Sequence, residues 1–177
     1  TTTYVYDGEN KSVNAVAYAN GIYFDKFNVT YTKDGTAATP NEVGTYDVGI
    51  ELTDANYVLA SLVSAQLTIR EAQQDFFSIE GVADTVTYGD APFNLQADGV
   101  DAGSTVKYSL ISGDAVTVTE DGLVTITGVG SVKIQAKSTL ANHTEKTAAR
   151  TFTVKPKTLN VTASPKVADK VYDGTKT

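Results

Sequence analysis

The sequence is informative first for what it lacks. Among its 177 residues there is no cysteine, methionine or tryptophan, and there is one histidine. A chain without cysteine has no disulfide framework and no thiolate metal site. No run of eighteen apolar residues occurs, so no membrane-spanning segment is expected. No basic segment followed by an apolar one opens the chain, and a secretion signal is therefore expected outside these residues.

Basic residues are also scarce relative to acidic ones. Lys and Arg number 14 against 21 Asp and Glu, which gives a formal net charge of −7. Binding to nucleic acid and attachment to anionic membranes both depend on clustered Lys and Arg, and here these residues are scattered singly. We therefore expect no nucleic acid and no membrane insertion. The acidic balance is interpreted as a contribution to solubility.

The chain does contain a repeated alternation of apolar and polar residues. Hydrophobic residues make up 41% and charged residues 20%, which is ordinary for a globular protein. A period of two predicts strands of antiparallel sheets that bury one face and expose the other. The apolar positions of the expected strands are Phe27, Val29 and Tyr31; Tyr46, Val48, Ile50 and Leu52; Ala65, Leu67 and Ile69; Phe93, Leu95 and Ala97; Val106, Tyr108 and Leu110; Val132, Ile134 and Ala136; and Phe152 with Val154.

Turn residues separate these runs at short intervals. Gly, Asn and Asp punctuate the Thr-, Val- and Tyr-rich segments, and no long helical pattern occurs. The stretch "YVLASLVSA" at 57–65 would also suit a short helix, but its neighbours favour a hairpin followed by a strand. "EDGLVT" at 120–125 is interpreted as a hairpin turn. Many short strands between frequent turns predict an all-β protein of the immunoglobulin-like sandwich type.

The chain aligns with itself. "VGTYDVGIELTDANY" at 43–57 lies over "VGSVKIQAKSTLANH" at 129–143 without a gap, so that Gly44 falls on Gly130 and Tyr57 on His143. The offset of 86 residues suits one small immunoglobulin-like sandwich. "VADTVTYGD" at 82–90 and "VADKVYDG" at 167–174 are interpreted as the same opening element of a repeat.

These repeats predict two tandem immunoglobulin-like antiparallel β-sandwiches plus the first strand of a third repeat. The expected boundaries are residues 1–70 for the first sandwich, 71–155 for the second, and 156–177 for a linker with the first strand of the next repeat. The polar stretch "REAQQ" at 70–74 separates the two sandwiches. "LNVTA" at 159–163 is predicted to form a strand that docks on a sheet edge, either of its own second domain or of the first domain of a neighbouring molecule.

The motifs of the first half resemble those of the bacterial extracellular repeats known as YDG and MBG domains. The resemblance is carried by "YVYDG" at 4–8, "VTYTKDGTAATPNEVGTYDVGI" at 29–50 and "AQLTI" at 65–69. Such repeats are stacked on long cell-surface and secreted proteins, where they serve as stalks, and the families have no assigned catalytic residues. The resemblance therefore implies a structural part of a bacterial surface protein.

The second half resembles two related groups. It opens like a YGX-type repeat with "TVTYGDAPFNL" at 85–95 and continues like a bacterial Ig-like domain of the intimin and invasin kind with "VKYSLISGDAVTVTEDGLVTITGVGSVKIQA" at 106–136. It departs from the first half at Val132, where the GTY motif of the repeat would place a tyrosine. We interpret it as a hybrid or diverged repeat.

Most residues that could carry chemistry are better interpreted as structural. An Asp-Gly pair favours a tight turn, and the preceding tyrosine would cover one end of the core; a contact with a metal ion or a sugar is the alternative. Tyr46, in "EVGTY", is interpreted as a tyrosine corner, whose phenol bonds to upstream backbone. The residues assigned to structural motifs are Tyr6, Asp7, Gly8, Gly44, Tyr46, Tyr57, Tyr88, Gly89, Gly130, His143, Tyr172, Asp173 and Gly174.

No catalytic residue is predicted, and no ligand-binding residue is assigned. His143 is the first candidate for a general base, but the self-alignment places it on Tyr57 in a turn before the last strand. No metal-ligand cluster and no zinc spacing occur, and no cofactor is expected. Calcium held by Asp and Glu oxygens at the domain junction is the alternative.

Three functions compete. The leading hypothesis is a non-catalytic spacer of a bacterial cell-surface or secreted protein, with neighbouring repeats of the same chain as partners. The second is a module that binds a glycan or a host protein through loops or an exposed sheet face. The third is an adhesin domain with an isopeptide bond, which requires a buried Lys beside Asn or Asp.

Overall fold

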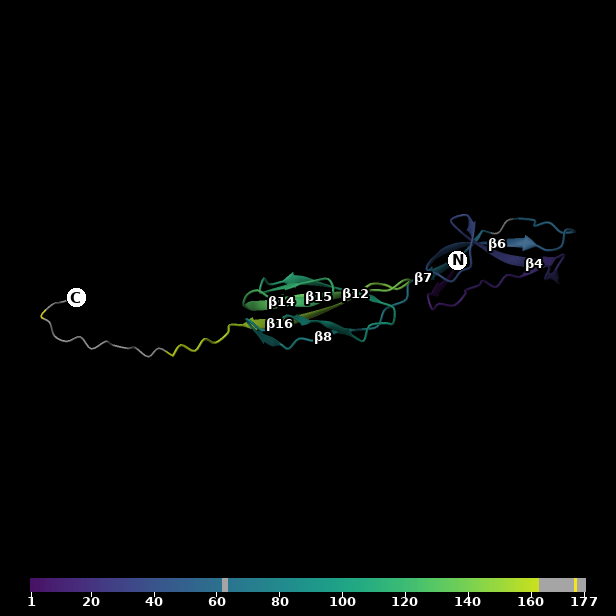
Figure 1. Ribbon diagram of the computed structural model, residues 1–177. Helices are drawn as coiled ribbons and strands as arrows, with labels where there is room; N and C mark the ends of the chain where they lie inside the picture. Colours follow the sequence, from purple (N-terminus) through teal and green to yellow (C-terminus); the bar gives the residue numbers. More distant parts are fainter. Residues whose placement is uncertain (62–63, 163–173, 175–177) are drawn as a thin grey trace.

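A computed structural model describes residues 1–61, 64–162 and 174 of the chain. All regular structure in these residues is β, and it comprises sixteen strands. In Figure 1 the strands form two groups that follow one another along the molecule, joined after β7 (Ala65–Arg70). We refer to residues 1–70 as the first unit and to residues 71–155 as the second unit.

The first unit is built on one five-stranded sheet. Its strand order is β1-β7-β6-β4-β5, and β1 pairs with β7 in parallel while the other pairs are antiparallel. A separate hairpin is formed by β2 and β3. The bounds are Thr2–Val5 for β1, Ala17–Ala19 for β2, Ile22–Phe24 for β3, Phe27–Lys33 for β4, Thr36–Ala37 for β5 and Gly44–Leu52 for β6.

One face of this sheet carries the core of the first unit. The alternation of β6 and β7 buries Tyr46, Val48, Leu67 and Ile69. The layer above them is mostly irregular chain, held in place by tyrosine hydroxyls. Val13 N–H donates to Tyr31 Oη at 2.9 Å, and Tyr4 Oη donates to the Ser12 carbonyl at 2.8 Å.

The second unit has two layers of sheet. One layer is the four-stranded sheet β12-β15-β16-β9, and the other contains β10-β14-β13 and the pair β11-β8. Phe77, Ile134 and Phe152 are among the side chains buried between them. The bounds are Ser78–Glu80 for β8, Thr85–Thr87 for β9, Phe93–Asn94 for β10, Gln96–Asp98 for β11, Thr105–Ser112 for β12, Val116–Val118 for β13, Leu123–Ile126 for β14, Gly130–Thr139 for β15 and Lys146–Lys155 for β16.

The two units share one half of their architecture. The order β1-β7-β6-β4 in the first unit matches β9-β16-β15-β12 in the second, and each includes one parallel pair, β1 with β7 and β9 with β16. The aligned glycines, Gly44 and Gly130, begin β6 and β15. The aligned turns also match, because Tyr57 N–H donates to Asp54 O and His143 N–H donates to Leu140 O, both at 3.2 Å.

These sheets confirm the all-β, immunoglobulin-like fold class, with differences in detail. The prediction of wholly antiparallel sheets is wrong for the two parallel pairs, because the strand that opens each unit runs beside the strand that closes it. The expected strand at Phe93–Ala97 is broken at Leu95, where β10 ends and β11 begins. The hairpin predicted within 57–65 is wrong for the described residues of this stretch, because 57–61 and 64 are not in a strand and β7 begins at Ala65.

The predicted strand "LNVTA" is also wrong for the single chain. Residues 156–162 have no regular structure and leave the end of β16 as an extended segment (Figure 1). Leu159 and Val161 are 83% and 77% exposed, so their apolar side chains enter no core formed by the described residues. Residue 163 and most of the opening element at 167–174 lie outside the described residues, and docking on another molecule remains a prediction.

Candidate functional site

The junction between the two units brings together residues that are far apart in the sequence. It is formed by the start of the loop after β1, the chain before β6, the linker after β7, and the turn between β15 and β16. Tyr6 packs against His143 in an edge-to-face contact, with ring centroids 5.5 Å apart and an interplanar angle of 79°. Val43 N–H donates to Asn142 Oδ1 at 3.0 Å. The first unit therefore rests on the turn that carries the only histidine.

The geometry of that turn explains the role of Asn142. Its φ of 62° lies in the left-handed region, which asparagine tolerates better than most residues. In this conformation the side chain faces the first unit, while the backbone carbonyl accepts from Ala72 N–H at 3.0 Å. His143 is held by the contact of its Nδ1 with the Ala141 carbonyl at 2.8 Å. Because a carbonyl oxygen only accepts, Nδ1 carries the proton in this contact.

The linker between the units is bonded to the same turn. Ala72 forms an isolated parallel bridge with His143, and its carbonyl accepts from Thr144 N–H at 2.9 Å. The chain therefore passes from one unit to the other as a short piece of sheet. A linker whose backbone groups are paired has less freedom to bend than a solvated one.

Gln74 secures the end of the linker inside the second unit. Its side chain is 5% exposed, and Nε2 donates to the carbonyls of Ser138 at 3.1 Å and Thr144 at 2.7 Å. Its Oε1 accepts from Ser138 Oγ at 2.6 Å and from Ser104 Oγ at 3.4 Å. A buried amide with both ends paired fixes its surroundings, because leaving any of these groups unpaired in the interior is costly.

Charged groups at the junction and elsewhere do not form a metal site in the described residues. No group of three or more His, Asp or Glu side chains in that part of the chain could hold a cation. Asp7 lies close to the junction, and hydrogen bonds from the Lys11 ammonium and from Glu9 N–H lower the pKa of its carboxyl. Its partners are therefore a lysine and the backbone, and calcium at the junction remains an untested alternative.

Tyr6, Asp7 and Gly8 lie at the turn that follows β1. Gly8 has a φ of 82°, and Asp7 Oδ1 accepts from Glu9 N–H at 2.9 Å, so this motif forms the tight turn that its sequence suggests. Tyr6 is half-buried against the core of the first unit. Its backbone N–H donates to Arg70 O at 2.9 Å.

The corresponding residues of the second unit lie at its far end. Tyr88 N–H donates to Lys155 O at 2.8 Å, which makes Tyr88 the structural counterpart of Tyr6, and its side chain is 47% exposed. Gly89 has a φ of 89°. Gly174 is exposed with a φ of 74°, whereas Tyr172 and Asp173 lie outside the described residues.

Tyr46 and the two aligned glycines lie at the starts of the central strands. Tyr46 Oη donates to Glu42 O at 3.0 Å, which is the bond that a tyrosine corner requires. Gly44 has a φ of 151° and Gly130 a φ of 142°, both in a region that favours glycine. At Gly44 an added Cβ would also lie 2.8 Å from Lys33 Cε and Nζ, while at Gly130 the nearest atom would be Ala115 Cβ at 4.0 Å.

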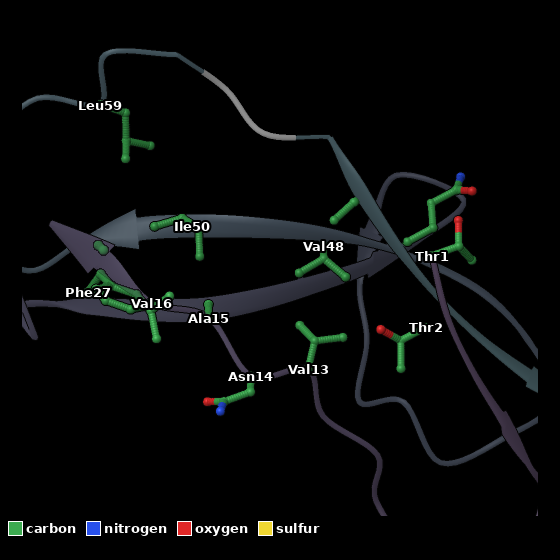
Figure 2. A pocket seen from close by; sticks show the side chains of 13 residues that line it. Thr1, Thr2, Val13, Asn14, Ala15, Val16, Phe27, Val48, Ile50 and Leu59 are labelled. Atoms are coloured by element: carbon green, nitrogen blue, oxygen red, sulfur yellow. The ribbon is translucent and has the colours of Figure 1, made fainter.

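A second feature is an apolar cavity in the first unit, of about 380 Å³. Val13 and Val48 point toward one another across it, and Leu59 approaches from the loop above (Figure 2). The residues that line it are Thr1, Thr2, Val13, Asn14, Ala15, Val16, Ala17, Phe27, Val48, Ile50, Leu59, Ala65 and Gln66.

Two junction residues were missed by reasoning from the sequence. Gln74 stands in a polar stretch, where nothing distinguishes a buried glutamine from a solvated one. Asn142 did carry a signal, since it aligns with Asn56 in the self-alignment. The alignment marked the turn, but it could not show that the asparagine side chain reaches the other unit.

The model of a protein family described as "MBG domain" matches residues 1–73. This match confirms an MBG-type repeat in the first part of the chain, as its motifs predict. The bacterial Ig-like character of the second part has only the all-β fold in its support. A comparison with curated proteins found no match. No helix in the described parts of the chain has the length and hydropathy needed to cross a bilayer.

Among solved structures, the chain is similar to two cadherins and to a CEACAM protein. Drosophila N-cadherin EC1-4 matches at 14% identity and a TM-score of 0.39, over 88% of this chain and 48% of that one. Chicken VE-cadherin EC1-2 matches at 12% identity and a TM-score of 0.36, over 89% of this chain and 98% of that one. Murine CEACAM1b matches at 13% identity and a TM-score of 0.34, over 72% of this chain and 67% of that one. The chain thus spans about half the length of the N-cadherin fragment. These low scores carry no argument on function.

Proposed function

We propose that this chain is a non-catalytic spacer, a pair of repeats that holds other parts of a bacterial cell-surface or secreted protein apart. The observation that carries the proposal is the bonded junction. A spacer must transmit position from one end to the other, and this requires a junction that resists bending. Here Asn142 and His143 of the second unit contact Val43 and Tyr6 of the first. The bridge at Ala72 and the buried Gln74 fix the linker to the second unit.

The MBG-type repeat over residues 1–73 supports an extracellular location, since repeats of this type occur in cell-surface proteins. The arrangement of strands supports the spacer role as well. The first unit contacts the turn after β15, and β16 then leads away from it to the opposite end of the second unit (Figure 1). A repeat linked in this manner adds its length to the array.

Small-angle scattering on the 177-residue chain tests the spacer role. A single compact domain of this size would have a radius of gyration of about 16 Å. Two units held end to end should give a clearly larger value and a distance distribution with two maxima. Inserting Gly-Gly after Arg70 should broaden the second maximum, because it lengthens the chain between the first unit and the bridge at Ala72. A wild-type profile as broad as that of the insertion variant would contradict a stiff spacer.

A second candidate function is a binding module, and one surface favours it. The β2–β3 hairpin exposes Tyr18, Ile22 and Tyr23, at 66%, 72% and 60%, and Tyr18 packs edge to face on Tyr23 at 6.3 Å. Exposed tyrosines offer flat apolar area with a polar tip, which suits sugars and protein surfaces. A glycan array probed with the chain and with Tyr18→Ala/Tyr23→Ala tests this function. Loss of a specific signal in the variant would support binding, and no signal with either would leave the spacer role alone.

A further inference from the structure

The tip of the β2–β3 hairpin carries the only Asn-Gly pair of the sequence, Asn20 followed by Gly21. Ala19 pairs with Ile22, so these two residues form the whole turn. Their φ values are 50° and 79°, and positive values at both positions are what a type I′ turn requires. Asn-Gly is also the pair in which the backbone attacks the asparagine side chain most easily, because glycine has no side chain beside its nitrogen.

The surroundings of this turn leave room for such an attack. Asn20 and Gly21 are both exposed to solvent. A Cβ placed on Gly21 would meet no atom within 4 Å. The strand pairing ends at Ala19 and Ile22, so the Gly21 N–H belongs to the turn and not to the ladder. No neighbouring group therefore hinders a bond between the Gly21 nitrogen and Asn20 Cγ.

The hairpin must open before this bond forms, since Asn20 has to leave the dihedral angles of the turn. β2 and β3 have three residues each, and in the part of the chain that the structure describes they pair only with each other. A two-stranded hairpin without a further strand is marginally stable in water. Near its tip Tyr18, Ile22 and Tyr23 are 66%, 72% and 60% exposed, so little apolar contact opposes opening.

Asn142 shows what protection would look like. It is the other asparagine with a left-handed φ among the described residues, at 62°. Its Oδ1 accepts from Val43 N–H at 3.0 Å, and the N–H that follows it, that of His143, donates to Leu140 O at 3.2 Å. Both groups that would react are held at Asn142, whereas the turn at Asn20 stands free in solvent.

We propose that Asn20 is a site of spontaneous deamidation, with water as the second reactant. The Gly21 nitrogen bonds to Asn20 Cγ and gives up its proton, the bond from Cγ to Nδ2 breaks, and ammonia leaves a cyclic succinimide. Water then opens the ring at Cγ, which gives aspartate, or at the backbone carbonyl carbon of residue 20, which gives isoaspartate. No electrons are transferred in either step.

The two products differ in their effect on the hairpin. Aspartate keeps the turn, because Asp-Gly suits a type I′ turn as Asn-Gly does. Isoaspartate places Cβ in the main chain and lengthens the loop, so the register that pairs Tyr18 with Tyr23 is lost. The edge-to-face contact of these rings, with centroids 6.3 Å apart, is lost with it. The spacer role does not depend on this change, which leaves the junction untouched.

Mass spectrometry of the full chain, aged in mildly alkaline buffer and then cut with trypsin, tests the site. Peptide 12–26 contains Asn20 and also Asn14, an exposed asparagine followed by alanine that serves as the internal control. The mass gain of an amide turned into an acid should accumulate on Asn20 and not on Asn14, and isoaspartate methyltransferase should label the product. Gly21→Ala should suppress the reaction. Equal rates at the two asparagines, or an unmodified Asn20, would overturn the proposal.

A comparison with the free peptide 12–26 tests the opening of the hairpin. The rate at Asn20 in the folded chain should lie within about tenfold of the rate in the peptide, since opening of an unsupported hairpin costs little free energy. Stronger protection than this would show that the closed turn shields Asn20, and would overturn the proposal.

NMR of the aged chain tests the consequence for the tyrosines. The ring signals of Tyr18 and Tyr23 should shift in molecules that contain isoaspartate. The matched control is freshly prepared Asn20→Asp, which has the charge of the aspartate product and an unaltered main chain, and its ring signals should stay close to those of the unaged protein. Unchanged signals in the isoaspartate form, or equal shifts in the control, would contradict the loss of register.

Discussion

The two units have the same four-stranded half-sheet and differ in what covers it. In the second unit a second layer of strands encloses a core in which Val124, Ile134 and Ala136 are 0% exposed. In the first unit the cover is irregular chain, fastened by the hydroxyls of Tyr4 and Tyr31, and a cavity of about 380 Å³ remains. The shared half-sheet also supplies the junction, which uses the ends of β1, β6 and β15. The contacts between the units are therefore made by the shared part and its ends, and the cover of the sheet differs between the units.

The largest expected effect is on the core of the second unit. Phe77→Ala should lower the free energy of unfolding of this unit by about 3–5 kcal/mol, since a fully buried aromatic side chain is removed. Calorimetry should show the transition of the second unit move to lower temperature while that of the first unit stays. The neighbouring Phe76 is 78% exposed, so Phe76→Ala is a matched control with an effect within about 0.5 kcal/mol. A single transition that moves as a whole would show that the units do not unfold independently.

The two aligned glycines compare the units directly. Gly44→Ala and Gly130→Ala should each cost about 1–3 kcal/mol, because both positions have a positive φ that alanine rarely adopts. Gly44→Ala should cost more, since its Cβ displaces Lys33, which donates to Val43 O at 3.0 Å. Urea unfolding of the two variants measures the difference. A larger loss at Gly130 than at Gly44 would contradict this account.

The junction is tested at Gln74. Gln74→Ala should cost about 1–3 kcal/mol, because it leaves the hydroxyl and carbonyl of Ser138 without their buried partner. The adjacent Gln73 is exposed, and Gln73→Ala should change little. Scattering should also show a wider distribution of distances between the units for Gln74→Ala alone. Identical stability for both variants would show that the amide is replaceable.

His143→Tyr should have a smaller effect, below about 1.5 kcal/mol, because tyrosine occupies the aligned position in the first unit and keeps an aromatic ring against Tyr6. His143→Ala should cost about 0.5–1.5 kcal/mol through loss of the ring contact. Thermal unfolding of the two variants shows which substitution lowers the stability more. A hydrolytic activity that disappears with His143 would refute the non-catalytic interpretation.

The comparison also shows which features the sequence could and could not predict. Strands such as β6, β7, β15 and β16 follow from alternation, because one buried face imposes a period of two on the residues. The cover of the first unit could not be foreseen, since it depends on bonds from tyrosine hydroxyls to backbone eight and eighteen residues away. The tail was misjudged because its alternation is that of a strand, but in residues 156–162 this alternation is not accompanied by strand pairing with any described residue.

The candidate site was foreseen only in part. The self-alignment pointed to the turn at His143 and to the glycines that begin β6 and β15. It gave no indication that Gln74 is buried, because burial of a lone polar side chain is decided by the surrounding fold. In the second unit Ser138 stands where the first unit has Leu52, and Ser138 Oγ donates to Gln74 Oε1 at 2.6 Å. The self-alignment shows the difference between Leu52 and Ser138, but the sequence does not show that Gln74 is the hydrogen-bond partner of Ser138.

The smallest effect concerns the turn of the first unit. Hydrogen bonds from Lys11 and Glu9 N–H lower the pKa of Asp7, so its charged form is favoured in the folded state. The contribution is therefore present above the pKa of the unfolded chain and is lost as pH falls through the lower folded value. The carboxylate is exposed to solvent, so the effect on stability should be slight. Carbonyl NMR titration should show a pKa for Asp7 below that of an ordinary aspartate, and Asp7→Asn identifies the Asp7 signal by removing it. A pKa of Asp7 at or above the ordinary aspartate value would contradict this account.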